Sequence, residues 1–289
     1  MGAVAALLKR EPRLFQSYVR IRETLELAPR QWRYRQSRPS LSPEARAALD
    51  QLRRDGIVML PDFVPADAVL EMQRVIDESI RDGRFRKPAG TTDADAARIA
   101  RLNIIDPTLH SARFIQYALN EFLVSVVNAY VGCDLFVSGI SVYRTQPVPD
   151  PPAGSFLWHY DNTPLQVKAI CYLTDVTESD GPLVFVPGTH RRRSTASTFE
   201  ETRIDEASIG SRERMVCVGK MGTVCLVDTS GVHRAQPNEL RSRDVVSAIY
   251  DPGTRARRTC FYNLPVPTPF IGSLRPEQRR MLRLPEYAG

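Results

Sequence analysis

Apolar positions between residues 40 and 130 recur every three to four residues, which is the period of amphipathic helices. Ser42-Pro43 predicts the start of a helix that runs to about residue 54, because Ser is a good N-cap and Pro suits the first helical turn. Asp55-Gly56 then predicts a turn into a short apolar strand. Two further helices are predicted, from Pro65 to Gly83 and over residues 112–130.

After Gly132 the pattern changes to short β-branched runs divided by Pro and Gly. We expect strands over residues 135–143, 156–159, 165–173, 183–186, 215–218, 223–227 and 245–250. Helices followed by many antiparallel strands predict a mainly β fold, a double-stranded β-helix (jelly roll, cupin-like) core buttressed by the N-terminal helices. Two polar segments, 83–100 and 191–214, are predicted to be loops.

Residues 1–40 are predicted to be a basic amphipathic extension of a single domain formed by residues 41–289. Their apolar positions follow an approximate helical period, and Pro12 breaks or restarts the helix. The segment holds nine Lys/Arg and three Glu, which accounts for the whole net charge of +6. Such a segment can lie on an anionic membrane, but we favour packing against the main domain or a partner subunit.

Composition and cysteine usage indicate a soluble, cytoplasmic protein. Hydrophobic residues make up 43% and charged residues 25% of the chain, and no apolar run is long enough to span a membrane. The five cysteines form no C-x-x-C pair, so reduced thiols are expected. The basic residues form no recognisable nucleic-acid-binding module, so no nucleic acid is expected as a partner.

The candidate chemistry lies in Trp158-His159-Tyr160-Asp161. On an extended segment, His159 and Asp161 point to the same face, because side chains alternate with period two. His233, 72 residues downstream, is the best candidate for a further ligand. Two imidazoles and one carboxylate with open positions form the facial triad of non-haem Fe(II) oxygenases.

Four stretches together indicate a family. They are 55–63 (DGIVMLPDF), 158–161 (WHYD), 172–190 (YLTDV through GPLVFVPGTH) and 222–243 (GTVCLVD through His233 to an arginine before the next strand). In this order and spacing the chain resembles the phytanoyl-CoA dioxygenase family of Fe(II)/2-oxoglutarate-dependent oxygenases. The resemblance covers about residues 42–250.

The resemblance implies that His159, Asp161 and His233 bind Fe(II). It also implies that 2-oxoglutarate chelates the iron, and that an arginine about ten residues after the distal His binds its far carboxylate. Arg243 fits best and Arg241 is the alternative. Further candidate contacts of 2-oxoglutarate or of an anionic substrate are Tyr143, Arg144, Thr145 and Lys168. His190 is expected to be structural.

The implied reaction uses O2 and converts 2-oxoglutarate to succinate and CO2, with ascorbate as a candidate reductant. We expect hydroxylation of an unactivated C–H bond in a small-molecule or lipid-like substrate. Because related halogenases replace the carboxylate ligand with a small residue, Asp161 favours hydroxylation. The alternatives are desaturation, cyclisation or epimerisation in secondary metabolism, and a non-catalytic metal-binding jelly roll.

The substrate is expected to contact the loops 83–104, 145–155 and 191–214, and an anionic group would suit the arginines there. These are Arg84, Arg86, Arg192 and Arg193. The sequence leaves the substrate and the oligomeric state open.

Overall fold

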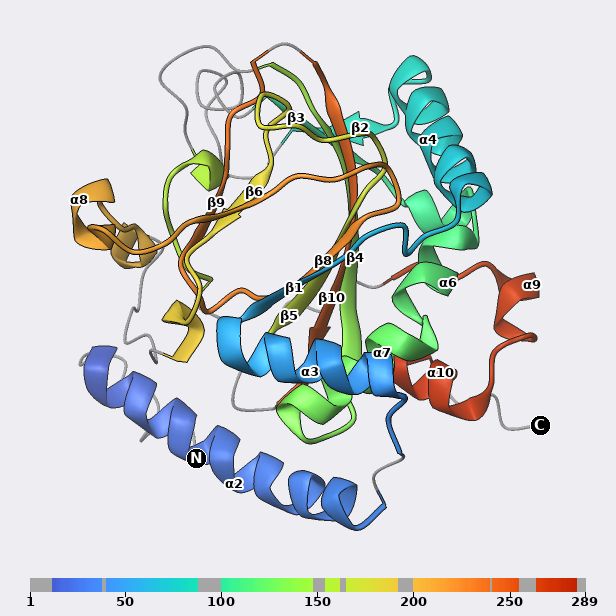
Figure 1. Ribbon diagram of the computed structural model, residues 1–289. Helices are drawn as coiled ribbons and strands as arrows, with labels where there is room; N and C mark the ends of the chain where they lie inside the picture. The colour runs from blue at the N-terminus through green and yellow to red at the C-terminus, as the bar shows by residue number, and fades with distance from the viewer. Residues whose placement is uncertain are drawn as a thin grey trace.

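A large antiparallel sheet has the strand order β1-β8-β5-β10-β4-β3-β2 (Figure 1). Its strands are β1 (Ile57–Leu60), β2 (Phe85–Arg86), β3 (Arg101–Ile104), β4 (Phe136–Thr145), β5 (Val167–Tyr172), β8 (Val224–Asp228) and β10 (Arg243–Asp251). The computed structural model describes residues 12–37, 40–87, 100–147, 154–161, 165–191, 200–239, 241–254 and 264–284; the side chains of residues 12–16 and 200 are outside this description.

A smaller antiparallel sheet has the order β7-β6-β9. It consists of β6 (Leu183–Phe185), β7 (Met215–Cys217) and β9 (His233–Ala235). The two sheets form a jelly roll, which confirms the predicted fold class. Phe185 lies in the smaller sheet and Val227 in the larger one, and both belong to one buried cluster, so the two sheets pack on each other.

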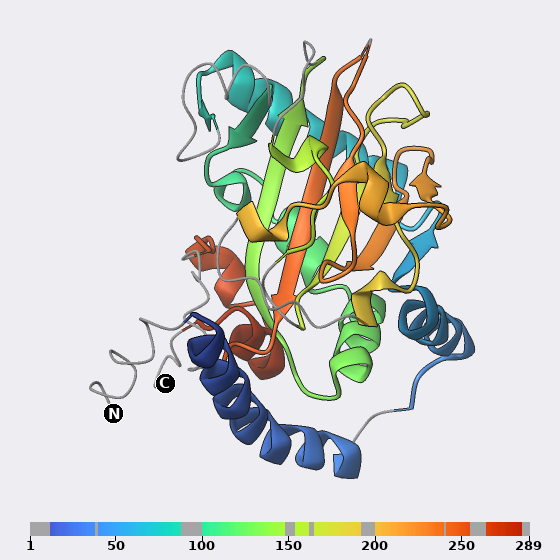
Figure 2. The same cartoon turned by 90° about the vertical axis from the view of Figure 1, so that its left-hand side faces the viewer.

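Helices cover the face of the large sheet that points away from the smaller sheet (Figures 1 and 2). The α-helices are α2 (Pro12–Ser37), α3 (Pro43–Asp55), α4 (Ala66–Arg81), α6 (Arg113–Ala118), α7 (Glu121–Val131), α8 (Glu206–Ile209), α9 (Thr268–Ile271) and α10 (Pro276–Met281). Short 3-10 turns lie at 107–109, 154–156, 189–191 and 200–202. The main core joins buried side chains of α3, α4, α6 and α7 to those of β4, β5, β8 and β10.

The predicted junction between α3 and β1 is confirmed in detail. The Ser42 hydroxyl accepts a hydrogen bond from the Ala45 amide at 3.2 Å, as an N-cap does. Gly56 ends the helix with a φ of +83°, a backbone conformation that glycine adopts most easily. A Cβ atom at Gly56 would lie 2.4 Å from His190 Nδ1, so the absence of a side chain also makes room for this ring.

Four predictions of secondary structure were wrong. The single helix predicted over 112–130 is divided into α6 and α7 at Leu119-Asn120, where the Asn120 side chain caps α7 by accepting from the Phe122 and Leu123 amides. The strand predicted over 156–159 is a 3-10 turn followed by an isolated bridge at His159. The segment 83–104 was predicted to be a loop but contains β2 and β3. The segment 191–214 was also predicted to be a loop but contains α8 and the 3-10 turn at 200–202.

The helix α2 packs beside the sheet-covering helices, with Leu27 in the main core. The Arg30 guanidinium donates hydrogen bonds to the carbonyls of Pro252 and Asp134, and Gln31 donates to the carbonyl of Val131. Residues 1–11 of the predicted extension lie outside the described residues. Within the described chain, no helix has both the length and the apolar character that a membrane crossing requires.

Candidate metal centre

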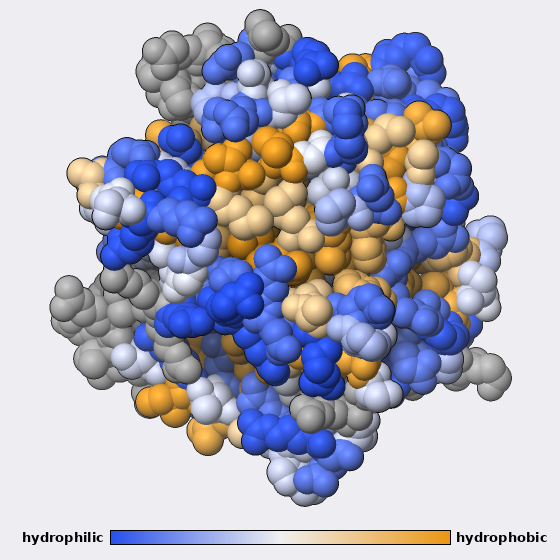
Figure 3. Space-filling model, in the orientation of Figure 1, coloured by the Kyte–Doolittle hydropathy of each residue, from blue (hydrophilic) through white to orange (hydrophobic). Residues whose placement is uncertain are grey.

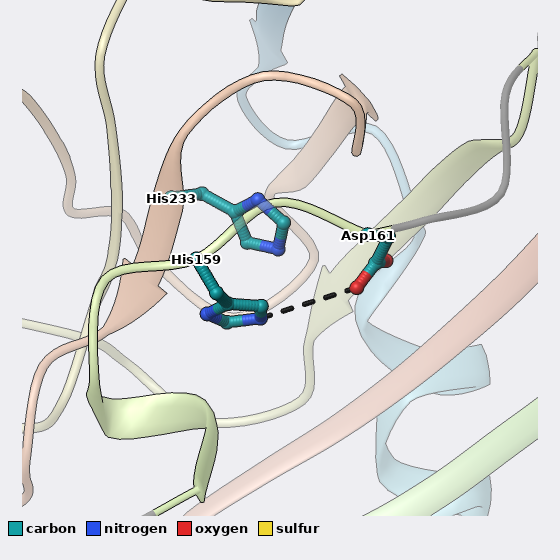
Figure 4. Close-up of side chains that lie close together, drawn as sticks. All are labelled: His159, Asp161 and His233. Carbon is teal, nitrogen blue, oxygen red and sulfur yellow. Dashed lines mark ion pairs between the residues drawn. The ribbon is translucent and has the colours of Figure 1, made fainter. Parts of the chain in front are cut away.

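The side chains of His159, Asp161 and His233 converge on one point between the two sheets (Figure 4). One ligand atom from each residue lies within 4.8 Å of the other two. His159 Nε2 and Asp161 Oδ1 are 4.0 Å apart, and the two imidazole centroids are 4.4 Å apart. This donor set of two imidazoles and a carboxylate can hold a single metal ion.

Backbone hydrogen bonds hold the three residues in register. The His159 amide donates to the His233 carbonyl at 2.9 Å, and the His233 amide donates to the His159 carbonyl at 2.7 Å. The Asp161 amide donates to the Thr229 carbonyl at 2.7 Å. These bonds join the segment 159–161 to the segment 229–233, so the chain's topology brings the predicted residues together.

Hydrogen bonds to carbonyl groups define the tautomer of both histidines. His159 Nδ1 lies 2.8 Å from the Leu157 carbonyl oxygen, and His233 Nδ1 lies 2.8 Å from that of Gly231. Because a carbonyl oxygen only accepts, Nδ1 carries the proton in each ring. Both Nε2 lone pairs are therefore available to a metal.

The charges at the centre suit a divalent cation. Burial, followed by the nearby charge of His233, lowers the pKa of His159 to about 3. Burial also lowers the pKa of His233, so both rings are neutral at pH 7. For Asp161, burial favours the protonated form. The ammonium of Lys168, 2.6 Å from Oδ2, outweighs it and holds the pKa well below its usual range.

The centre opens into a cavity with about 800 Å³ of empty space, its open mouth included. Four of the predicted cofactor-binding residues line it, namely Tyr143, Thr145, Lys168 and Arg243. The Arg243 side chain is 4% exposed, and its Nε has no hydrogen-bond partner in the described part of the chain. A buried guanidinium beside a metal centre suits a carboxylate ligand.

Arg241 and Arg144 lie elsewhere. The Arg241 guanidinium donates two hydrogen bonds to Asp180, at 3.0 and 3.1 Å, and does not line the cavity. Arg144 points to the opposite face of β4, where it forms ion pairs with Asp244 and Asp77.

The remaining predicted residues are peripheral. His190 Nε2 lies 3.2 Å from the Arg53 carbonyl oxygen, as befits a structural residue. Arg84 pairs with Asp82, and Arg86 is exposed on β2. Arg192 and Arg193 lie outside the described residues, as do parts of all three loops expected to contact the substrate.

Arg101 was not predicted to be a cavity residue, because the segment 83–104 was predicted to be a loop. Arg101 lies opposite Thr145 on β4, and Thr145 lies opposite Arg243 on β10, so the three side chains share one face of the sheet. The Arg101 guanidinium lies 3.5 Å from the Tyr143 ring centroid and donates to Ser141 Oγ. The alternation of polar and apolar residues over 101–104 was the available signal.

Solved structures with the same fold include enzymes of nogalamycin biosynthesis. The structure of the non-haem α-ketoglutarate-dependent epimerase SnoN from nogalamycin biosynthesis, in complex with Fe3+, α-ketoglutarate and nogalamycin RO, aligns with a TM-score of 0.59 and 20% identity. The alignment covers 73% of this chain and 84% of that one. The carbocyclase SnoK from the same pathway aligns with a TM-score of 0.58 and 20% identity, at the same coverage. No curated protein sequence matches this chain.

The jelly roll, with two histidines and a carboxylate clustered between its sheets, defines the class of Fe(II)- and 2-oxoglutarate-dependent oxygenases. The sequence model of the phytanoyl-CoA dioxygenase (PhyH) family matches residues 52–243, which is more than half of the chain. The chain belongs to this family, and it is a 2-oxoglutarate-dependent oxygenase that acts on a small molecule.

Proposed function

We propose that His159, Asp161 and His233 bind Fe(II), that Arg243 binds the far carboxylate of 2-oxoglutarate, and that the reaction is a hydroxylation. One observation carries this proposal. A cluster of two neutral imidazoles and one ionised carboxylate shares a cavity with a buried guanidinium whose Nε has no hydrogen-bond partner in the described chain. These residues match the two ends of an iron-chelating keto dicarboxylate.

Iron and 2-oxoglutarate, when bound, supply an oxidant for C–H bonds by way of oxidative decarboxylation to succinate and CO2. The protein orients and shields the reactants. Lys168 engages Asp161 Oδ2, which leaves Oδ1 directed toward His159 and supports a carboxylate that binds through one oxygen. Ile170, Leu183 and Phe156 form an apolar part of the cavity wall and exclude water.

Hydroxylation is favoured because Asp161 occupies the carboxylate position, so that no halide site is opened there. The apolar part of the cavity supports a lipid-like or otherwise apolar substrate. The four cysteines in the described chain are free and buried, which supports the proposal that the protein works in the reducing cytoplasm.

Epimerisation or ring closure is the second candidate. It is favoured by the likeness to the epimerase SnoN and the carbocyclase SnoK. Mass analysis of the product distinguishes the outcomes, because hydroxylation adds one oxygen atom from O2 and these alternatives add none.

The test of the ligands is succinate formation by the iron-loaded protein. Asp161→Asn and His233→Ala are expected to bind iron at least about 100-fold more weakly and to lose turnover, because each removes one of three donors. His110→Ala is the matched control, because His110 is exposed and lies outside the cavity. Turnover and iron affinity that are unchanged in both ligand variants would overturn the proposal.

A further inference from the structure

The outer face of α2 carries a stripe of exposed apolar side chains. Ile21, Leu25, Ala28 and Trp32 are four, three and four residues apart, so they lie on one side of the helix. Ile21, Leu25 and Trp32 are 61%, 69% and 62% exposed. Figure 3 shows apolar side chains along the lower edge of the molecule, where α2 lies in Figure 1.

This stripe is not the face by which α2 packs on the protein. The buried residues of the helix are Val19, Glu23 and Leu27, which lie on its opposite side. Arg30, on that same packed side, donates to backbone carbonyls of the domain. The apolar stripe therefore points away from the rest of the molecule, and α2 is held firmly enough to present it.

Positive charge borders the stripe on both sides. At 100° per residue, Arg35 falls at one edge of the stripe, and Arg20, Arg22 and Arg33 fall on the two flanks between the stripe and the packed side. Over residues 17–37, where side chains are described, the acidic residues are Glu23 and Glu26, and both fall on the packed side. The outward face is thus apolar in the middle, basic at the edges and free of acidic groups over residues 17–37.

We propose that the outer face of α2 binds the surface of a membrane that contains anionic phospholipids. Ile21, Leu25 and Trp32 enter the boundary between headgroups and acyl chains, and the flanking arginines reach lipid phosphates with their apolar stems lying along the stripe. Trp32 suits this depth, because an indole ring has an apolar body and a polar N–H.

The small area of the stripe argues against a second copy of the chain or another protein. Three such side chains, about two-thirds exposed, offer on the order of 400 Å² of apolar surface, whereas a stable protein interface buries roughly 800 Å² on each partner. A membrane needs no complementary shape, and shallow insertion combined with charge is sufficient for reversible binding.

The experiment is co-sedimentation of the full-length protein with vesicles of phosphatidylcholine alone or of phosphatidylcholine mixed with phosphatidylglycerol. We expect binding to the mixed vesicles that weakens as salt is added, and little binding to the neutral ones. The triple variant Ile21→Ser/Leu25→Ser/Trp32→Ser should bind at least about tenfold more weakly. The matched control is Leu70→Ser on α4, which removes a side chain that is 56% exposed elsewhere and should bind as the parent does.

Tryptophan fluorescence gives a second readout in the unaltered chain. Trp32 is 62% exposed and Trp158, the only other tryptophan, is 3% exposed, so a blue shift on adding mixed vesicles reports Trp32. Absence of both binding and blue shift would overturn the proposal. Vesicle binding by the triple variant that equals binding by the parent would also overturn it, and so would a loss of binding in Leu70→Ser as large as that in the triple variant. A parent protein that forms a dimer and does not bind vesicles, with the dimer lost in the triple variant, would overturn it as well.

Discussion

At the scale of single residues, the two histidines of the metal centre are neutral because they are buried, not because of the pH. Their hydrogen bonds to the carbonyls of Leu157 and Gly231 leave the Nε2 lone pairs available at any pH at which the rings stay neutral. The same burial lowers the free energy of unfolding of the metal-free protein at acidic pH, because the unfolded chain then binds protons that the folded chain does not bind.

This cost predicts how the stability of the metal-free protein depends on pH. An unfolded histidine titrates near pH 6.5, whereas the pKa of folded His159 is about 3 and that of His233 is also lowered. The unfolded state therefore binds more protons below about pH 6.5, and the free energy of unfolding should fall by up to about 1.4 kcal/mol per pH unit for each histidine. Urea titrations between pH 7 and pH 4.5 measure this slope, in a range where Asp161 stays ionised.

His159→Gln should flatten the slope, because it removes one of the two buried imidazoles. A slope that is the same in the parent and the variant would contradict the burial argument.

Arg243 and Arg241 form a natural pair for testing the cosubstrate site. Arg243→Gln should raise the 2-oxoglutarate concentration needed for half-maximal succinate formation by roughly 30- to 300-fold, because it removes a positively charged, bidentate hydrogen-bond donor. Arg241→Gln removes an arginine that is two residues away and bound to Asp180. This variant should change the half-maximal 2-oxoglutarate concentration by less than about threefold. The opposite ranking of the two variants would assign the carboxylate to Arg241.

At the scale of elements, the junction between α3 and β1 depends on the absence of a side chain at Gly56. Gly56→Ala should destabilise the protein by about 2–4 kcal/mol, since it adds a left-handed alanine and a clash with the His190 ring. Gly83 also has a positive φ, +71°, but a Cβ there would meet nothing within 4 Å. Gly83→Ala should therefore cost only about 1 kcal/mol. Thermal or urea unfolding measures the difference, and equal losses would mean that the His190 contact is unimportant.

Local sequence signals predicted the elements that depend on local chemistry. The Ser42 cap, the Gly56 turn and the long strands β4, β5 and β10 lie close to their predicted positions, because capping and period-two alternation act over a few residues. The break before α7 was missed because Asn120 lies inside a continuous apolar pattern, and its capping role is visible only once the helix has stopped.

The elements of the site that depend on distant pairing were harder to predict. β9 has only three residues and exists because it pairs with β6, and β3 exists because it pairs with β4. The three residues that cluster at the candidate metal centre were nevertheless predicted, since residue type and spacing carry that information. Lys168 was predicted as a candidate cofactor contact, but its ion pair with Asp161 and the cavity position of Arg101 depend on strand register and could not be predicted in this way.

At the scale of the whole molecule, we propose that residues 41–289 form the oxygenase domain and that residues 1–40 are an accessory segment, consistent with a family match that begins at residue 52. Removing residues 1–40 should preserve turnover of 2-oxoglutarate but lower the free energy of unfolding by roughly 2–4 kcal/mol. This cost reflects the lost burial of Leu27 and the lost bonds of Arg30 and Gln31. Loss of turnover in a truncated protein that still folds would place α2 inside the catalytic unit.

The mutual backbone hydrogen bonds between His159 and His233 have a consequence for how such a protein can diversify. Their donors and acceptors are main-chain atoms, so the spacing of the two imidazoles does not depend on which side chains surround them. Mutations in the cavity wall can accumulate without moving the ligands. A scaffold of this kind can acquire new specificities while its oxidising centre stays in place.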